Sequence, residues 1–81
     1  MKIEILGSGC MKCNKLYELT KRIVEENGID ADVVKVEDIN RMVELGLWAT
    51  PGLAVNGKIL SAGRLPSPDD LKDILREAGR Q

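Results

Sequence analysis

The fold is decided by residues 2–13, which read KIEILGSGCMKC. Residues 2–6 are short and rich in isoleucine, and Gly-Ser-Gly follows them, so they are typical of a strand that ends in a sharp turn. Cys10 and Cys13 then open a segment with helical periodicity that extends to about Asn27, where Gly28 is a natural stop. A cysteine pair between a first strand and a first helix favours a redox or metal-binding role.

The rest of the chain continues this alternation. Valines predict a second strand over 32–37, and Asp38 can cap a short helix that runs to Leu45 and stops at Gly46. Residues 53–55 and 58–60 form a hairpin around Asn56-Gly57, a pair that suits a type I′ turn. Ser67 and Pro68 open the last helix. The apolar faces expected to be buried are Leu16, Leu19, Ile23 and Val24 in the first helix, Ile39, Met42, Val43 and Leu45 in the second, and Leu71, Ile74, Leu75 and Ala78 in the third.

The expected architecture is α/β, in the order β-α-β-α-β-β-α. The first two strands should be parallel, because a helical crossover joins them, and the hairpin adds two antiparallel strands. This predicts a four-stranded mixed sheet with two helices on one face and the short helix on the other. The length of 81 residues predicts one domain over 1–81.

Composition excludes several classes of function. The formal net charge is −1, which argues against a nucleic-acid binder. The chain has no histidine, so it lacks the commonest zinc ligand, and its two cysteines cannot form a multi-disulfide framework. The N-terminus does not resemble a signal peptide, and no apolar stretch is long enough to span a bilayer. We therefore expect a soluble cytoplasmic protein without a membrane or nucleic-acid partner.

The position of the cysteine pair defines its expected chemistry. Backbone N–H groups and the helix macrodipole at a helix N-terminus stabilise a thiolate, so Cys10 is the expected nucleophile. Cys13 lies one turn later on the same side and can reach Cys10 to form a disulfide. Two alternatives stay open: two thiolates can carry a soft metal ion such as Cu(I) or a metalloid, and the pair can be inert within an adaptor protein.

The segment Ala49-Thr50-Pro51-Gly52 precedes the hairpin and completes a recognisable pattern. With the Cys10–Cys13 pair, Asn56-Gly57 and Gly63, it resembles the thioredoxin/glutaredoxin superfamily over essentially the whole chain. The likeness is closest to the small thioredoxin-like "redox-active disulfide" proteins of archaea and bacteria. The resemblance implies a thioredoxin fold, a cis Thr50–Pro51 peptide facing the cysteines, and thiol–disulfide oxidoreductase activity. Between the cysteines, Met11-Lys12 differs from the Gly-Pro of thioredoxins and the Pro-Tyr of most glutaredoxins.

The same resemblance suggests roles for further residues. Glu4 is a candidate proton relay for Cys13, although a half-exposed strand face also explains an acid at that position. Trp48 is either packed in the core or placed at the rim of the redox site. Met11, Lys12, Trp48, Thr50 and Pro51 are the expected substrate-binding residues.

The expected partners are a disulfide-containing protein substrate and a separate disulfide reductase. The chemistry requires no cofactor beyond the reversible Cys10–Cys13 disulfide, no metal site is expected, and we expect a monomer.

Overall fold

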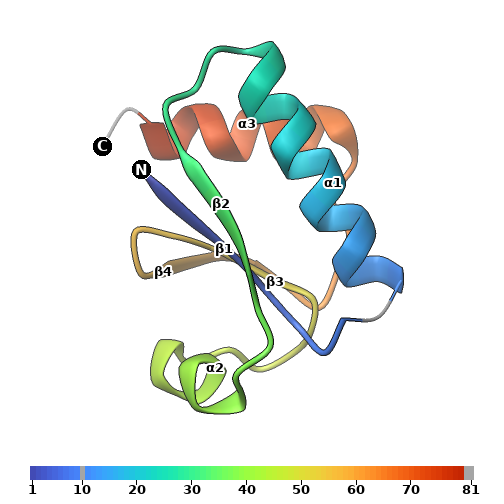
Figure 1. Cartoon of the computed structure of the whole chain (residues 1–81), viewed down its shortest axis with the longest axis vertical. Helices are drawn as coiled ribbons and strands as arrows, with labels where there is room; N and C mark the ends of the chain where they lie inside the picture. The colour runs from blue at the N-terminus through green and yellow to red at the C-terminus, as the bar shows by residue number, and fades with distance from the viewer. Residues whose placement is uncertain (10, 80–81) are drawn as a thin grey trace.

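A computed structural model describes residues 1–9 and 11–79 of the chain (Figure 1). Its elements follow the expected order β-α-β-α-β-β-α. Their bounds are β1 Lys2–Leu6, α1 Met11–Glu26, β2 Asp32–Val36, α2 Ile39–Leu45, β3 Gly52–Val55, β4 Lys58–Ala62 and α3 Pro68–Gly79. The expected start of the first helix at Cys10 lies outside the described residues.

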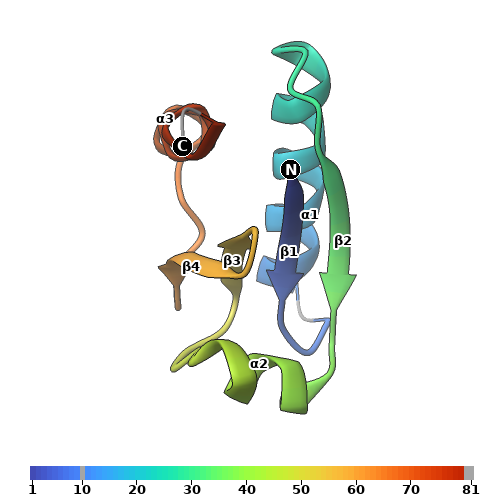
Figure 2. The same cartoon turned by 90° about the vertical axis from the view of Figure 1, so that its left-hand side faces the viewer.

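The four strands form one mixed sheet in the order β2-β1-β3-β4. Strand β1 pairs in parallel with β2 and antiparallel with β3, which pairs antiparallel with β4. Helices α1 and α3 cover one face of the sheet and α2 lies against the other, as the two orthogonal views show (Figures 1 and 2). This is the thioredoxin fold that the sequence predicts, with β1 in the centre of the sheet.

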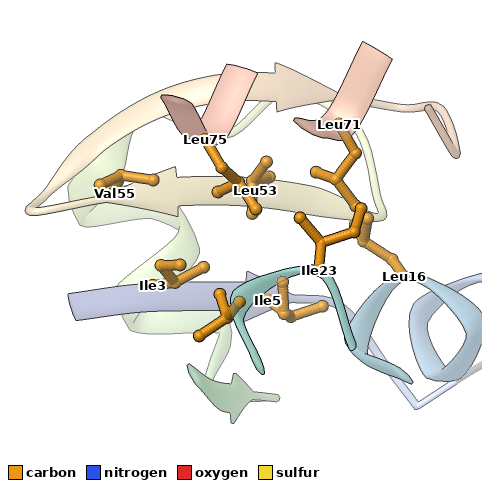
Figure 3. Close-up of a cluster of buried hydrophobic side chains, with 9 residues drawn as sticks. Ile3, Ile5, Leu16, Ile23, Leu53, Val55, Leu71 and Leu75 are labelled. Carbon is orange, nitrogen blue, oxygen red and sulfur yellow. The ribbon is translucent and has the colours of Figure 1, made fainter. Parts of the chain in front are cut away.

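The larger core lies between the sheet and the helices α1 and α3 (Figure 3). Every second residue of β1 enters it, because successive strand side chains point to opposite faces. Its buried members are Ile3, Ile5, Leu16, Ile23, Val24, Leu53, Val55, Leu71 and Leu75. The smaller cluster, under α2, has Leu6, Met42 and Ala54 as its buried members.

Capping residues and turns hold the elements at their expected ends. Asp38 caps α2, since its side chain accepts a hydrogen bond from the Asn40 backbone N–H at 2.9 Å. Gly46 ends the same helix in the left-handed conformation, and its N–H donates to backbone carbonyls of the last turn. Asn56 and Gly57 both have positive φ, as a type I′ turn requires.

The prediction for the buried face of α2 is partly wrong. Met42 is buried and Leu45 is half-buried, but Ile39 and Val43 are exposed to 72% and 71%. A helix of seven residues presents only one narrow stripe to the sheet, and Met42 and Leu45, three positions apart, occupy that stripe. Ile39 and Val43, four positions apart, form a second stripe that faces solvent.

Candidate functional site

The candidate site lies where β1 ends and α1 begins, and Gly7 is its centre. A side chain at this position would point toward α1, on the same face as Ile3 and Ile5. A Cβ placed on Gly7 would overlap the sulfur of Cys13 and would lie 3.9 Å from the Cα of Pro51. Because Gly7 has no side chain, the Cys13 sulfur can approach the end of β1 beside Pro51.

Pro51 is held in place by the strands on either side of it. It is buried, and the Thr50–Pro51 peptide bond is cis, in agreement with the resemblance. Its carbonyl oxygen accepts a hydrogen bond from the N–H of Gly63 at 2.9 Å, just beyond β4. The next residue, Gly52, pairs with Leu6 across β3 and β1. Since Leu6 precedes Gly7, this pairing brings Pro51 level with the end of β1.

Cys13 belongs to the buried stripe of α1. It is 4% exposed, and it stands three positions before Leu16 and seven before Thr20, both of which are buried. The sulfur of Cys13 is therefore shielded from large molecules in solution. The other member of the pair, Cys10, lies outside the described residues, so its expected role as the nucleophile stays a prediction.

Three of the expected substrate-binding residues are exposed near this centre. Met11 is 73% exposed and Lys12 is exposed, and both belong to the first turn of α1, beside Cys13 in the chain. Thr50 is exposed and precedes the buried Pro51. An apolar thioether, an ammonium group and a hydroxyl are thus exposed on the two segments that adjoin Cys13 and Pro51 in the chain.

Trp48 is exposed to 76%, so the alternative that placed it in the core is wrong. Its side chain contributes to a shallow pocket of about 310 Å³ beside β4 and α3, together with Ala62, Arg64 and Ile74. The other alternative, a rim position for Trp48 beside the cysteine pair, stays a prediction.

Glu4 lies on the opposite face of the sheet from α1. It is 3% exposed, so the explanation by a half-exposed strand face is wrong. Its two carboxylate oxygens accept hydrogen bonds from Nε and Nη2 of Arg41 in α2, at 3.0 and 2.8 Å. The hydrogen bonds from Arg41 hold the pKa of Glu4 below its usual value despite burial. A low pKa makes this carboxylate a poor proton acceptor, so the geometry favours an ion pair over a relay.

Metal ligands are sparse in the part of the chain that is described. No group of three or more His, Cys, Asp or Glu side chains gathers there in a way that could hold a metal ion. In the same residues no helix is long and apolar enough to cross a membrane.

Two features of the site were not evident in the sequence. The sequence predicts that Gly7 ends the strand in a sharp turn, and the structure shows that it also accommodates the Cys13 sulfur. Arg41 had no role until the tertiary structure brought it to Glu4, 37 positions away. The alternation Ile3, Ile5, Gly7 is a signal that could have indicated the first feature, but no local pattern predicts the second.

Comparison with known proteins adds an independent line of support. A family model described as "Thioredoxin domain" matches residues 1–76. A protein named thioredoxin from Methanocaldococcus jannaschii is 46% identical over 74 residues, which cover 91% of this chain and 85% of the relative. Another thioredoxin, from Methanothermobacter thermautotrophicus, is 43% identical over 75 residues, covering 93% and 97%. An uncharacterized 9.0 kDa protein from Acidithiobacillus ferrooxidans is 30% identical over 63 residues, covering 74% and 73%.

Proposed function

The chain belongs to the thioredoxin family, and from this premise we propose that it reduces protein disulfides through Cys10 and Cys13. The observation that carries the proposal is the burial of Cys13 against Gly7 and Pro51. A shielded thiol is badly placed to attack a disulfide of another molecule. It suits the second step, in which the attacked sulfur belongs to the same chain.

In the first step the Cys10 thiolate attacks one sulfur of the substrate disulfide. A bond forms between Cys10 and that sulfur, the substrate disulfide breaks, and the other substrate sulfur leaves as a thiolate. In the second step Cys13 loses its proton and attacks the Cys10 sulfur, which releases the remaining substrate thiolate. Two electrons pass to the substrate, its two thiolates take up protons, and a Cys10–Cys13 disulfide remains.

Several expected properties follow from this reaction. A separate disulfide reductase must return two electrons to restore the dithiol, and no cofactor is needed within the chain itself. Met11, Lys12, Trp48, Thr50 and Pro51 are proposed to contact the substrate, and the first four are exposed to solvent. We propose a cytoplasmic monomer, because a reducing compartment keeps the pair ready to react.

The proposal is tested by trapping the mixed disulfide. Cys13→Ser should stop the reaction after the first step, so the variant should remain covalently bound to substrate through Cys10 until a thiol reductant is added. Cys10→Ser is the matched control, because it also replaces one cysteine by serine, and it should form no adduct. The wild-type protein should catalyse reduction of insulin by dithiothreitol, and both variants should lose this activity.

Three outcomes would contradict the proposal or its assigned roles. Peptide mapping in which iodoacetamide modifies Cys13 faster than Cys10 would reverse the roles of nucleophile and resolving cysteine. Tight binding of one Cu(I) per pair without insulin reduction would favour the metal carrier. Absence of adducts, of insulin reduction and of metal binding would favour an adaptor with inert cysteines.

A further inference from the structure

We propose that Glu37 lowers the reactivity of Cys10 by holding a carboxylate against the turn that precedes it. This inference rests on the proposed redox function of the cysteine pair. Glu37 directly follows β2, and its side chain reaches the Gly7–Gly9 turn: a Cβ placed on Gly9 would lie 3.1 Å from Oε1 of Glu37. Gly9 is the residue immediately before Cys10 in the chain.

The contact belongs to a turn that is fixed on this side of the molecule. The N–H of Gly7 donates to the carbonyl of Val36 at 3.0 Å. The carbonyl of Gly9 accepts from Nδ2 of Asn14 at 3.4 Å, and Oδ1 of Asn14 accepts from Nζ of Lys35 at 2.8 Å. The turn is therefore tied to the end of β2, from which Glu37 extends.

The conformation of Gly9 allows the Glu37 carboxylate to lie close to the turn. Its φ is +81°, a left-handed value that residues with side chains rarely adopt. The absence of a Cβ leaves the space into which the carboxylate of Glu37 reaches. Gly9 thus shapes the turn and also leaves space for the Glu37 carboxylate next to its own backbone, one residue before Cys10.

Other charged groups lie on the elements that flank the turn, and three of the five have polar partners of their own. They are Lys12 and Lys15 on α1, Lys35 on β2, Asp38 after β2 and Arg41 on α2. Lys35 is engaged with Asn14 and lies 4.8 Å from the centre of the Tyr17 ring. Asp38 caps α2, and Arg41 binds Glu4 and Glu44. The segment 47–51 contributes no charge, and the thiol of Cys13 is the remaining titratable group in the pair.

The direction of the effect follows from electrostatics. A nearby carboxylate disfavours a thiolate, so Glu37 raises the pKa of Cys10 and opposes the lysines and the helix N-terminus. Thiolate formation stabilises the reduced state, so a carboxylate that opposes it makes the pair a stronger reductant. Because Glu37 is exposed, its effect is modest and should weaken as salt is added.

The test is Glu37→Gln in the full chain, which removes the charge and keeps the shape. We expect the pH profile for alkylation of Cys10 by iodoacetamide to shift to lower pH, with about threefold more thiolate at neutral pH. In a dithiothreitol redox buffer the Cys10–Cys13 couple should be more reduced than in the wild type, by a factor that rises with pH toward about threefold. Both effects should shrink between about 10 mM and 500 mM salt.

The matched control is Glu26→Gln, which removes the same charge at the last residue of α1, at the other end of the helix. The inference fails if Glu37→Gln behaves like this control, or if its effect persists unchanged at high salt. It also fails if Glu37→Asp, which keeps the charge, alters the profile as much as Glu37→Gln. A wild-type protein that forms no Cys10–Cys13 disulfide in the redox buffer would overturn the proposed function and this inference together.

Discussion

The two faces of the sheet are closed in different ways. Two long helices cover one face, and the side chains that α1 and α3 bury there are apolar apart from Thr20. On the other face α2 is only seven residues long, and beneath it a small apolar cluster lies beside the buried Glu4 and its partner Arg41. A helix of seven residues cannot cover a whole sheet face with apolar side chains. The Arg41–Glu4 ion pair occupies part of the area that remains. The comparison suggests that stability resides mainly on the α1–α3 face.

The largest expected difference between the faces concerns large apolar side chains. Leu71→Ala should lower the free energy of unfolding by about 3 kcal/mol, because Leu71 is fully buried in the larger core. Met42→Ala, its counterpart under α2, should cost about 2 kcal/mol, since Met42 retains 9% exposure and the cavity can partly collapse. Urea unfolding of both variants measures the difference. Equal losses would remove the proposed asymmetry.

Gly7→Ala tests the α1 face where it meets the redox site. The new methyl group would overlap the Cys13 sulfur, so we expect a loss of about 2 kcal/mol in unfolding free energy and slower insulin reduction. Gly57→Ala is not a suitable control, because φ is positive there. Ser8→Ala, at the neighbouring exposed position, is suitable. Unchanged activity and stability in Gly7→Ala would show that Cys13 moves away without cost.

The ion pair under α2 predicts a pH dependence with a definite sign. Because the pKa of Glu4 is lowered in the folded state, its stabilising contribution is fully present above the usual value near 4.5 and is lost as pH falls below it. Glu4→Gln should therefore be less stable than the wild type at neutral pH, by less than Leu71→Ala, and the two should converge in acid. Unfolding midpoints measured from neutral pH to about pH 3 check this.

Arg41→Gln provides the complementary test of the same ion pair. It leaves the buried carboxylate without its main donor, so it should be more harmful at neutral pH than in acid, and adding Glu4→Gln should restore part of the loss. If the two substitutions change the free energy of unfolding additively, the Glu4–Arg41 interaction contributes no coupling energy to stability. If instead Glu4→Gln changes the pH profile of the second redox step without changing stability, the relay role gains support.

The smallest effect should come from the outer stripe of α2. Val43→Ser should change the free energy of unfolding by less than about 0.5 kcal/mol, because the side chain is 71% exposed. Val24→Ser, in the larger core, is the matched buried substitution and should be far more destabilising. A large loss in Val43→Ser would show that this stripe is covered in solution.

The sequence by itself determined the order of the elements, the mixed sheet and most of the larger core. These features depend on local signals: alternation in β1, the stripe from Leu16 to Val24 in α1, the Asp38 cap and the Asn56-Gly57 turn. Each signal acts within a few residues, so the chain around it suffices for the prediction. The position of Cys10 and Cys13 between the first strand and the first helix is also a local signal, and it indicated the redox site.

Only the tertiary structure decided which side chains meet across elements. It buried Glu4 and paired it with Arg41, left Ile39 and Val43 exposed, and turned Trp48 toward β4. It also brought Glu37 to Gly9 and the Cys13 sulfur to Gly7. A helix or strand pattern states that a face is apolar but not how much of that face its neighbour covers. That depends on the length of α2 and its position on the sheet, which the assembled fold alone fixes.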